Sequence, residues 1–217
     1  MKPLSLACGV ALGLAVAAAA PSAVAQEPGA ASASASSTTT APKLHAALRS
    51  LWHGHIVNTR AYAMAVKDGK RSEAKKAADD VVANAKQIAD AVAGFYGKPA
   101  GEQMLKLLAG HWAGVKALTD AEHSGDKAAH QKAMQDLAQN ATAIAKFLAG
   151  ANPNLPEATV QGLLMMHVAD HETQTDQIMA GDTTGEAQTW MHMQAHMNTI
   201  ADALADAIAK QFPSKAS

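Results

Sequence analysis

Hydrophobic side chains recur at steps of three and four residues through the chain after residue 43. Over residues 44–66, Leu48, Trp52 and their apolar neighbours fall on one stripe of a helical surface. Residues 81–95 show the same spacing after an Asp68-Gly69 turn. The pattern predicts a helical hairpin, in which a short turn with glycine joins two amphipathic helices.

The hairpin pattern occurs three times, with a period of 56 residues. Three histidines, His55, His111 and His167, each follow an apolar pair and occupy equivalent positions. Self-similarity at a fixed period predicts three copies of one structural unit. The same period aligns the turn glycines Gly69, Gly125 and Gly181, the polar residues Asn84, Asn140 and His196, and the isoleucines Ile88, Ile144 and Ile200.

Three hairpins predict an all-α fold of six helices, each about 20–25 residues long. Each helix is too apolar on one stripe to be stable alone, so the hairpins must share one core. The hairpins can close around a pseudo-threefold axis as a compact bundle, or stack as an open superhelix. We favour the compact bundle, because three copies are the minimum for a stack and no polar capping repeat is evident.

The start of the chain has the features of an export signal. Met1-Lys2 precedes an apolar stretch over residues 4–20, and Ala23-Val24-Ala25 supplies a small-x-small cleavage site. We therefore predict a signal peptide over residues 1–25 that is cleaved, and a periplasmic or secreted protein. An uncleaved anchor is disfavoured because the apolar stretch is at the short limit for a membrane span. Lipidation is disfavoured because Cys8 lies at the start of this stretch rather than after it.

Residues 26–42 consist almost entirely of small and polar side chains and cannot bury a core. They predict a disordered tether, followed by a triplicated helical-hairpin domain over residues 43–213. With the signal removed, the mature chain contains no integral membrane segment.

Composition and charge exclude several classes of function. The formal net charge is −1 and no stretch is strongly basic, so we expect no nucleic-acid partner. The single cysteine excludes a disulfide framework, an iron–sulfur cluster and a cysteine-based zinc site. No Glu-x-x-His pair indicates a di-iron bundle, and no serine neighbours an obvious catalytic triad. These observations favour a protein that is not an enzyme, and leave a protein partner open.

The chain also carries several short motifs with a characteristic order. They are Leu51-Trp52-x-x-His55-x-x-x-Thr59-Arg60, Phe95-Tyr96-Gly97, Leu107-Leu108-x-x-His111, Asn152-Pro153, Leu163-Leu164-x-x-His167 and Gln211-Phe212-Pro213. These motifs resemble those of an uncharacterised family of exported bacterial all-helical proteins. The likeness covers residues 44–213 and implies an all-helical fold and export, without an established activity. Members are sometimes labelled glycosyltransferase or acetylglutamate kinase, but the chain lacks the glycine-rich phosphate loop and βαβ alternation of nucleotide-binding enzymes.

The recurring histidines support two hypotheses. In the first, His55, His111 and His167 form a structural polar network with the equivalent residues of the second helices, which would fix the packing. In the second, the three histidines converge on the axis of a closed bundle and bind a transition metal. His171 would join them, because it lies four residues after His167 on the same helix face. His196 is a reserve ligand.

The chain contains ten methionines and ten histidines, and its last third is rich in both. Met165, Met166, Met191, Met193 and Met197 lie among its histidines. Soft thioethers mixed with imidazoles in an exported protein favour copper over zinc. The alternative is that methionine only fills gaps in an alanine-rich core.

Overall fold

The computed structural model describes residues 41–216 of the 217-residue chain. The predicted signal peptide at 1–25 lies outside the described residues, as does the predicted tether at 26–42 except for residues 41 and 42. The first helix begins at Pro42, one residue before the predicted start of the folded domain.

The described chain is all-helical, as predicted, with six helices of 24 to 29 residues. Proline occupies the first or second position of α1 and α3, where a missing backbone N–H costs no helical hydrogen bond. The turn glycines Gly125 and Gly181 follow α3 and α5 with φ of 70° and 75°, a left-handed conformation that favours glycine. The helices are α1 (Pro42–Lys67), α2 (Arg71–Tyr96), α3 (Lys98–Ser124), α4 (Lys127–Ala151), α5 (Glu157–Ala180) and α6 (Thr183–Gln211).

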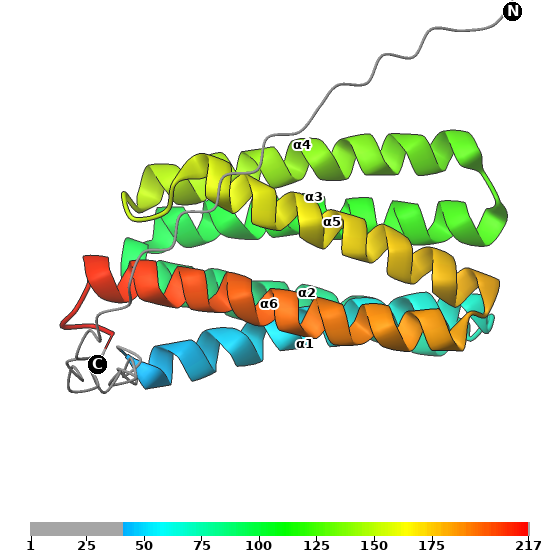
Figure 1. Cartoon of the computed structure of the whole chain (residues 1–217), viewed down its shortest axis with the longest axis horizontal. Coiled ribbons are helices and arrows are strands. Elements are labelled where there is room, and N and C mark those ends of the chain that lie inside the picture. Colours follow the sequence, from blue (N-terminus) through cyan, green and yellow to red (C-terminus); the bar gives the residue numbers. More distant parts are fainter. Residues whose placement is uncertain (1–40, 217) are drawn as a thin grey trace, which may run out of the picture. The chain divides into compact units, whose positions relative to one another are not determined.

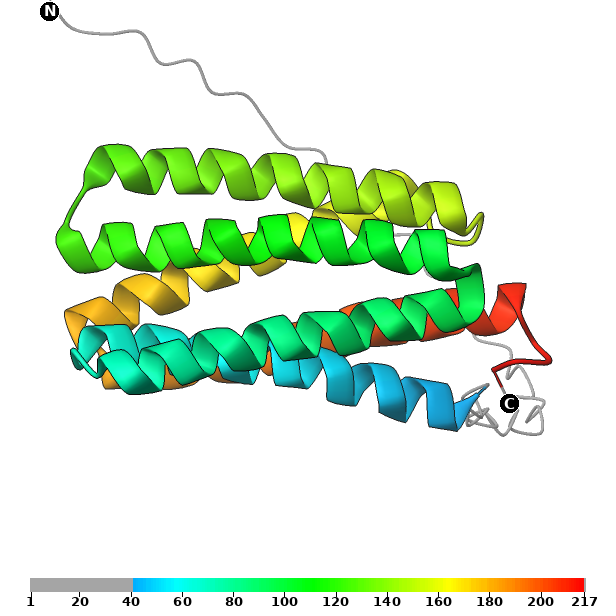
Figure 2. The ribbon, with the colours of Figure 1, turned by 180° about the vertical axis from the view of Figure 1, so that it is seen from behind.

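The six helices form a closed, compact bundle, which is the predicted arrangement and not the open stack. Each helix packs against the next along the chain, and α6 packs against α1 to close the ring. The odd-numbered helices α1, α3 and α5 also contact one another, so they surround the centre. Figures 1 and 2 show the helices running lengthwise, with α5 crossing obliquely from the α3–α4 hairpin towards α1 and α2.

Aliphatic side chains from all six helices fill the interior. Ile56, Leu118, Leu137 and Met193 are completely buried and come from four different helices. Alanines pack between these larger side chains, and burial of this apolar surface is the main source of stability. No helix within residues 41–216 is both long and apolar enough to cross a membrane.

Three of the sequence motifs meet at one end of the bundle. The side-chain amide of Asn152 donates to the Tyr96 hydroxyl at 2.9 Å, and this hydroxyl donates to Gln211 Oε1 at 3.1 Å. The ring of Phe212 lies against both Phe95 and Tyr96, with centroid distances of 5.9 Å and 5.1 Å. These contacts tie together the ends of α2, α4 and α6.

Polar side chains reinforce the junction between the first and last helices. The imidazole of His45 lies 2.8 Å from Asp202 Oδ1 and 2.9 Å from Asp206 Oδ1. Further along, Arg60 donates two hydrogen bonds to the carboxylate of Glu186, at 2.6 and 2.7 Å. Both contacts join residues more than one hundred positions apart in the chain.

Candidate metal centre

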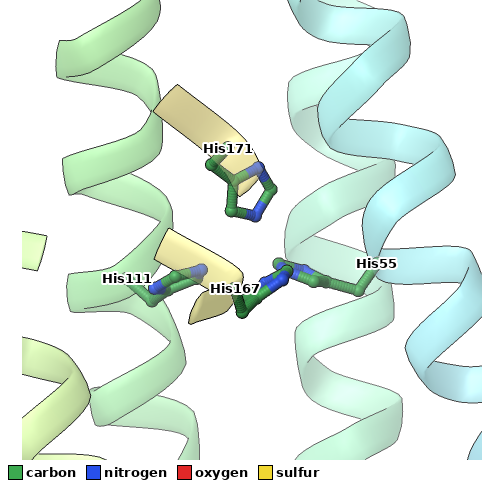
Figure 3. Close-up of side chains that lie close together, drawn as sticks. All are labelled: His55, His111, His167 and His171. Carbon is green, nitrogen blue, oxygen red and sulfur yellow. The ribbon is translucent and has the colours of Figure 1, made fainter. Parts of the chain in front are cut away.

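Four buried histidines converge in the centre of the bundle. His55 comes from α1, His111 from α3, and His167 and His171 from α5. Figure 3 shows the four rings facing a shared space from these three helices. One nitrogen of each ring can be chosen so that all four lie within 4.8 Å of one another. Each histidine exposes 5% of its surface or less.

The ring positions follow directly from the repeat and the closed bundle. The centroids of His55, His111 and His167 form a nearly equilateral triangle with sides of 5.5, 5.5 and 5.6 Å. His171 is one helical turn beyond His167, with its centroid 4.3 Å from that ring and 5.6 to 5.8 Å from the other two. The His171 ring therefore lies over one face of the triangle. The equivalent positions in α1 and α3 are Thr59 and Val115.

The imidazole nitrogens are poorly satisfied by hydrogen bonds. Within residues 41–216, neither nitrogen of His111 has a partner, and His167 Nδ1 and His171 Nε2 also lack one. One close contact joins two of the rings, between His167 Nε2 and His55 Nε2 at 3.4 Å. Buried polar atoms without partners are uncommon in folded proteins. These nitrogens are therefore free to bind a ligand.

Burial keeps the four rings neutral. Desolvation and, secondarily, the nearby His111 lower the pKa of His55 to about 3, and desolvation lowers the pKa of His111 to about 4. Desolvation, followed by repulsion from neighbouring imidazoles, lowers the pKa of His167 and of His171 well below the usual 6.5. Neutral imidazole has a free lone pair, which is the form that binds a metal ion.

The structure places His196 apart from the four clustered histidines. Its Nε2 donates to the backbone carbonyl of Leu163 at 2.9 Å. Asn84 donates in the same way to Leu51, and Asn140 to Leu107, at 2.9 and 3.0 Å. The hypothesis that these three residues pair with His55, His111 and His167 is therefore wrong in its partners. The second helix of each hairpin (α2, α4 or α6) lies outside the central group of α1, α3 and α5. From there its polar side chain reaches a backbone carbonyl instead.

The methionines of the last hairpin do not point to one shared site. Met165, Met166 and Met191 expose 38%, 49% and 63% of their surface, so they face solvent rather than the buried cluster. Met193 and Met197 belong to the hydrophobic core, as the gap-filling alternative predicts.

Two polar groupings escaped the sequence analysis. Glu122, His130 and Asp176 bring their ligand atoms within 4.8 Å at a partly exposed site, where burial and the Glu122 carboxylate raise the pKa of Asp176. The buried Asp170 lies 2.9 Å from His192 Nδ1. Asp176 has an aspartate, Asp120, at the equivalent position of the second hairpin, but neither grouping as a whole recurs, so the repeat could not reveal them.

No protein family, curated protein or solved structure matches this chain. The resemblance to exported helical proteins therefore stays a prediction. What defines the class of protein is the architecture itself, a closed six-helix bundle with four neutral histidines at its centre.

Proposed function

We propose that the protein binds one transition-metal ion at His55, His111, His167 and His171. The observation that carries this proposal is the convergence of four buried imidazoles, four of whose eight nitrogens are buried without a hydrogen-bond partner. An unpartnered buried polar group costs about 1–3 kcal/mol, and a metal ion would use the same lone pairs as ligands. A sequence selected for packing alone would place leucine at these positions.

The geometry suits a first-row metal. A metal–imidazole bond of about 2.1 Å places two nitrogens of a tetrahedral site about 3.4 Å apart. The 3.4 Å separation of the His55 and His167 nitrogens already matches this spacing. The remaining pairs lie within 4.8 Å, so modest rotation of His111 and His171 would complete the site.

Copper fits the site better than zinc. Four neutral imidazoles supply no negative charge, so the full charge of the ion remains in an apolar interior. The cost of burying an ion rises with its charge, which favours Cu(I) over Zn²⁺. Among divalent ions, nitrogen sites also bind Cu²⁺ more tightly than Zn²⁺. The preference for copper does not depend on the methionines.

We place the protein in the periplasm or outside the cell. Support comes from the apolar stretch and the Ala23-Val24-Ala25 site at the start of the sequence. Sequencing the amino terminus of the mature protein tests this, because the expected first residue is Gln26. An intact Met1 on exported or membrane-bound protein would contradict it.

Metal titration of the purified protein tests the binding proposal. We expect one copper ion per chain, and at a hundredfold excess over the dissociation constant a gain of about 2.7 kcal/mol in the free energy of unfolding. Replacing both His167 and His171 by glutamine should abolish binding and leave the helical circular dichroism nearly unchanged.

The matched control is the pair His192 and His196, which has the same four-residue spacing on α6. Glutamine at both positions should leave the copper stoichiometry at one. Loss of copper from this variant but not from the His167/His171 variant would place the site on α6 and refute the proposal. Stability that no metal alters would favour the purely structural role of the histidines.

A further inference from the structure

An apolar cavity adjoins three of the four clustered histidines. It has a volume of about 30 Å³, which is room for one or two water-sized molecules. Its walls consist of His55, His111 and His167 together with aliphatic side chains and Trp52. Among the residues that the structure describes, no charged side chain lines it.

The cavity and His171 lie on opposite sides of the histidine triangle. Because the short connections make consecutive helices antiparallel, α1, α3 and α5 run in the same direction. The cavity residues of these helices, such as Leu108 and Leu164, precede the triangle histidines, whereas His171 follows His167. A metal ion held by the four rings would therefore have His171 on one side and the cavity on the other.

The lining selects the kind of molecule that can occupy this space. Bound water needs two to four polar partners, and the side chains of the cavity wall offer only the imidazole nitrogens, which the metal would use, and the single indole N–H of Trp52. An anion would find no cationic side chain in the walls. We propose, as an extension that rests on the metal-binding proposal, that the cavity admits a neutral apolar molecule of diatomic size to the face of the metal opposite His171. On Cu(I), whose electron shell four imidazoles already fill, this molecule would take the place of one imidazole. Dioxygen, carbon monoxide and nitric oxide belong to this class.

Carbon monoxide on the Cu(I)-loaded protein is the probe. The wild-type protein should give a saturable C–O stretching band with one carbon monoxide per copper. Ala203 lines the cavity from α6, so Ala203→Leu should fill it, weaken carbon monoxide binding by about tenfold or more and retain one copper.

A neighbouring cavity of about 40 Å³ provides the matched control. Ala91 lines that cavity from α2 and no histidine does, so Ala91→Leu should leave the affinity for carbon monoxide unchanged. A carbon monoxide affinity that Ala203→Leu leaves unaltered would overturn the proposal.

Size selection keeps the proposal testable if Ala203→Leu does not fold. The wild-type protein should exclude tert-butyl isocyanide, and Leu163→Ala, which enlarges the same cavity, should admit it. Equal binding of this ligand by both proteins would refute the proposal. The copper content distinguishes failure of the metal-binding proposal from failure of the cavity proposal. A protein that binds no copper would refute the metal site. A protein that binds copper but gives no C–O band would refute the cavity proposal alone.

Discussion

Four imidazoles in an aliphatic interior carry a desolvation cost that leucine at the same positions would not. The cost is greatest where no hydrogen bond compensates it, and both nitrogens of His111 are in that situation. The apolar contacts of the bundle therefore stabilise the fold, whereas desolvation of the four central imidazoles destabilises it. Such a conflict between packing and local chemistry is typical of functional sites.

The metal-free protein should unfold in mild acid. An unfolded histidine has a pKa near 6.5, whereas burial holds the pKa of His55 at about 3 and that of His111 at about 4. The unfolded chain thus binds more protons, so stability is complete above pH 6.5 and falls as the pH falls. Between about pH 5.5 and 4, these two residues alone should lower the free energy of unfolding by about 2 kcal/mol per pH unit. Denaturant titrations at several pH values measure this slope.

His171→Val is the control for this pH dependence. Valine is the residue that α3 carries at the equivalent position, Val115. The substitution removes one buried imidazole, so the acid midpoint of unfolding should shift to lower pH. A midpoint that stays the same would mean that the cluster does not cause the acid sensitivity.

At the scale of helix pairs, a glycine opposite an asparagine recurs in the first two hairpins. The amide of Asn84 or Asn140 reaches a carbonyl of the preceding helix, and a Cβ at Gly54 or Gly110 would lie 2.9 Å from that amide nitrogen. The third hairpin has Met166 and His196 at these positions. The longer imidazole makes the same kind of hydrogen bond without a glycine.

A double-mutant cycle tests this pairing of Gly110 and Asn140. Gly110→Ala alone should displace the amide and lose a hydrogen bond, at a cost of about 1 kcal/mol. In the Asn140→Ala background the clash is absent, so Gly110→Ala should stabilise by up to about 1 kcal/mol through helix propensity. Chemical denaturation measures the four free energies. Additive effects would show that the two residues do not interact.

The sequence predicted the six helices because most have a long apolar stripe, all have a glycine or proline near their ends, and the repeat identified α5, whose buried face is mostly polar. One of its two hypotheses for the histidines also placed His55, His111, His167 and His171 on one axis, since equivalent positions meet when repeats close. The partners of Asn84 and Asn140 were predicted wrongly. Side-chain reach across a helix interface depends on the rotation of both helices, and residue spacing does not contain that rotation.

At the scale of the whole molecule, closure depends on the contact of α1 with α6. No periodicity links His45 to Asp202, or Arg60 to Glu186, because these pairs form once rather than three times. The sequence therefore left the closed bundle and the open stack as alternatives. The same closure brings His167 and His171 to His55, so fold and site depend on one interface.

Truncation after Gly150 tests this dependence. The shortened chain lacks α5 and α6, which exposes the apolar faces of α1, α3 and α4 that they cover. We expect an aggregating chain without cooperative unfolding, because two hairpins cannot enclose the core. It should also fail to bind copper, since only His55 and His111 remain of the four ligands.

Size-exclusion chromatography and thermal unfolding by circular dichroism measure these outcomes. The control is the full-length His167/His171 glutamine variant, which lacks the site but retains the third hairpin. A monomeric 150-residue product that unfolds cooperatively would show that the third hairpin is not needed for closure.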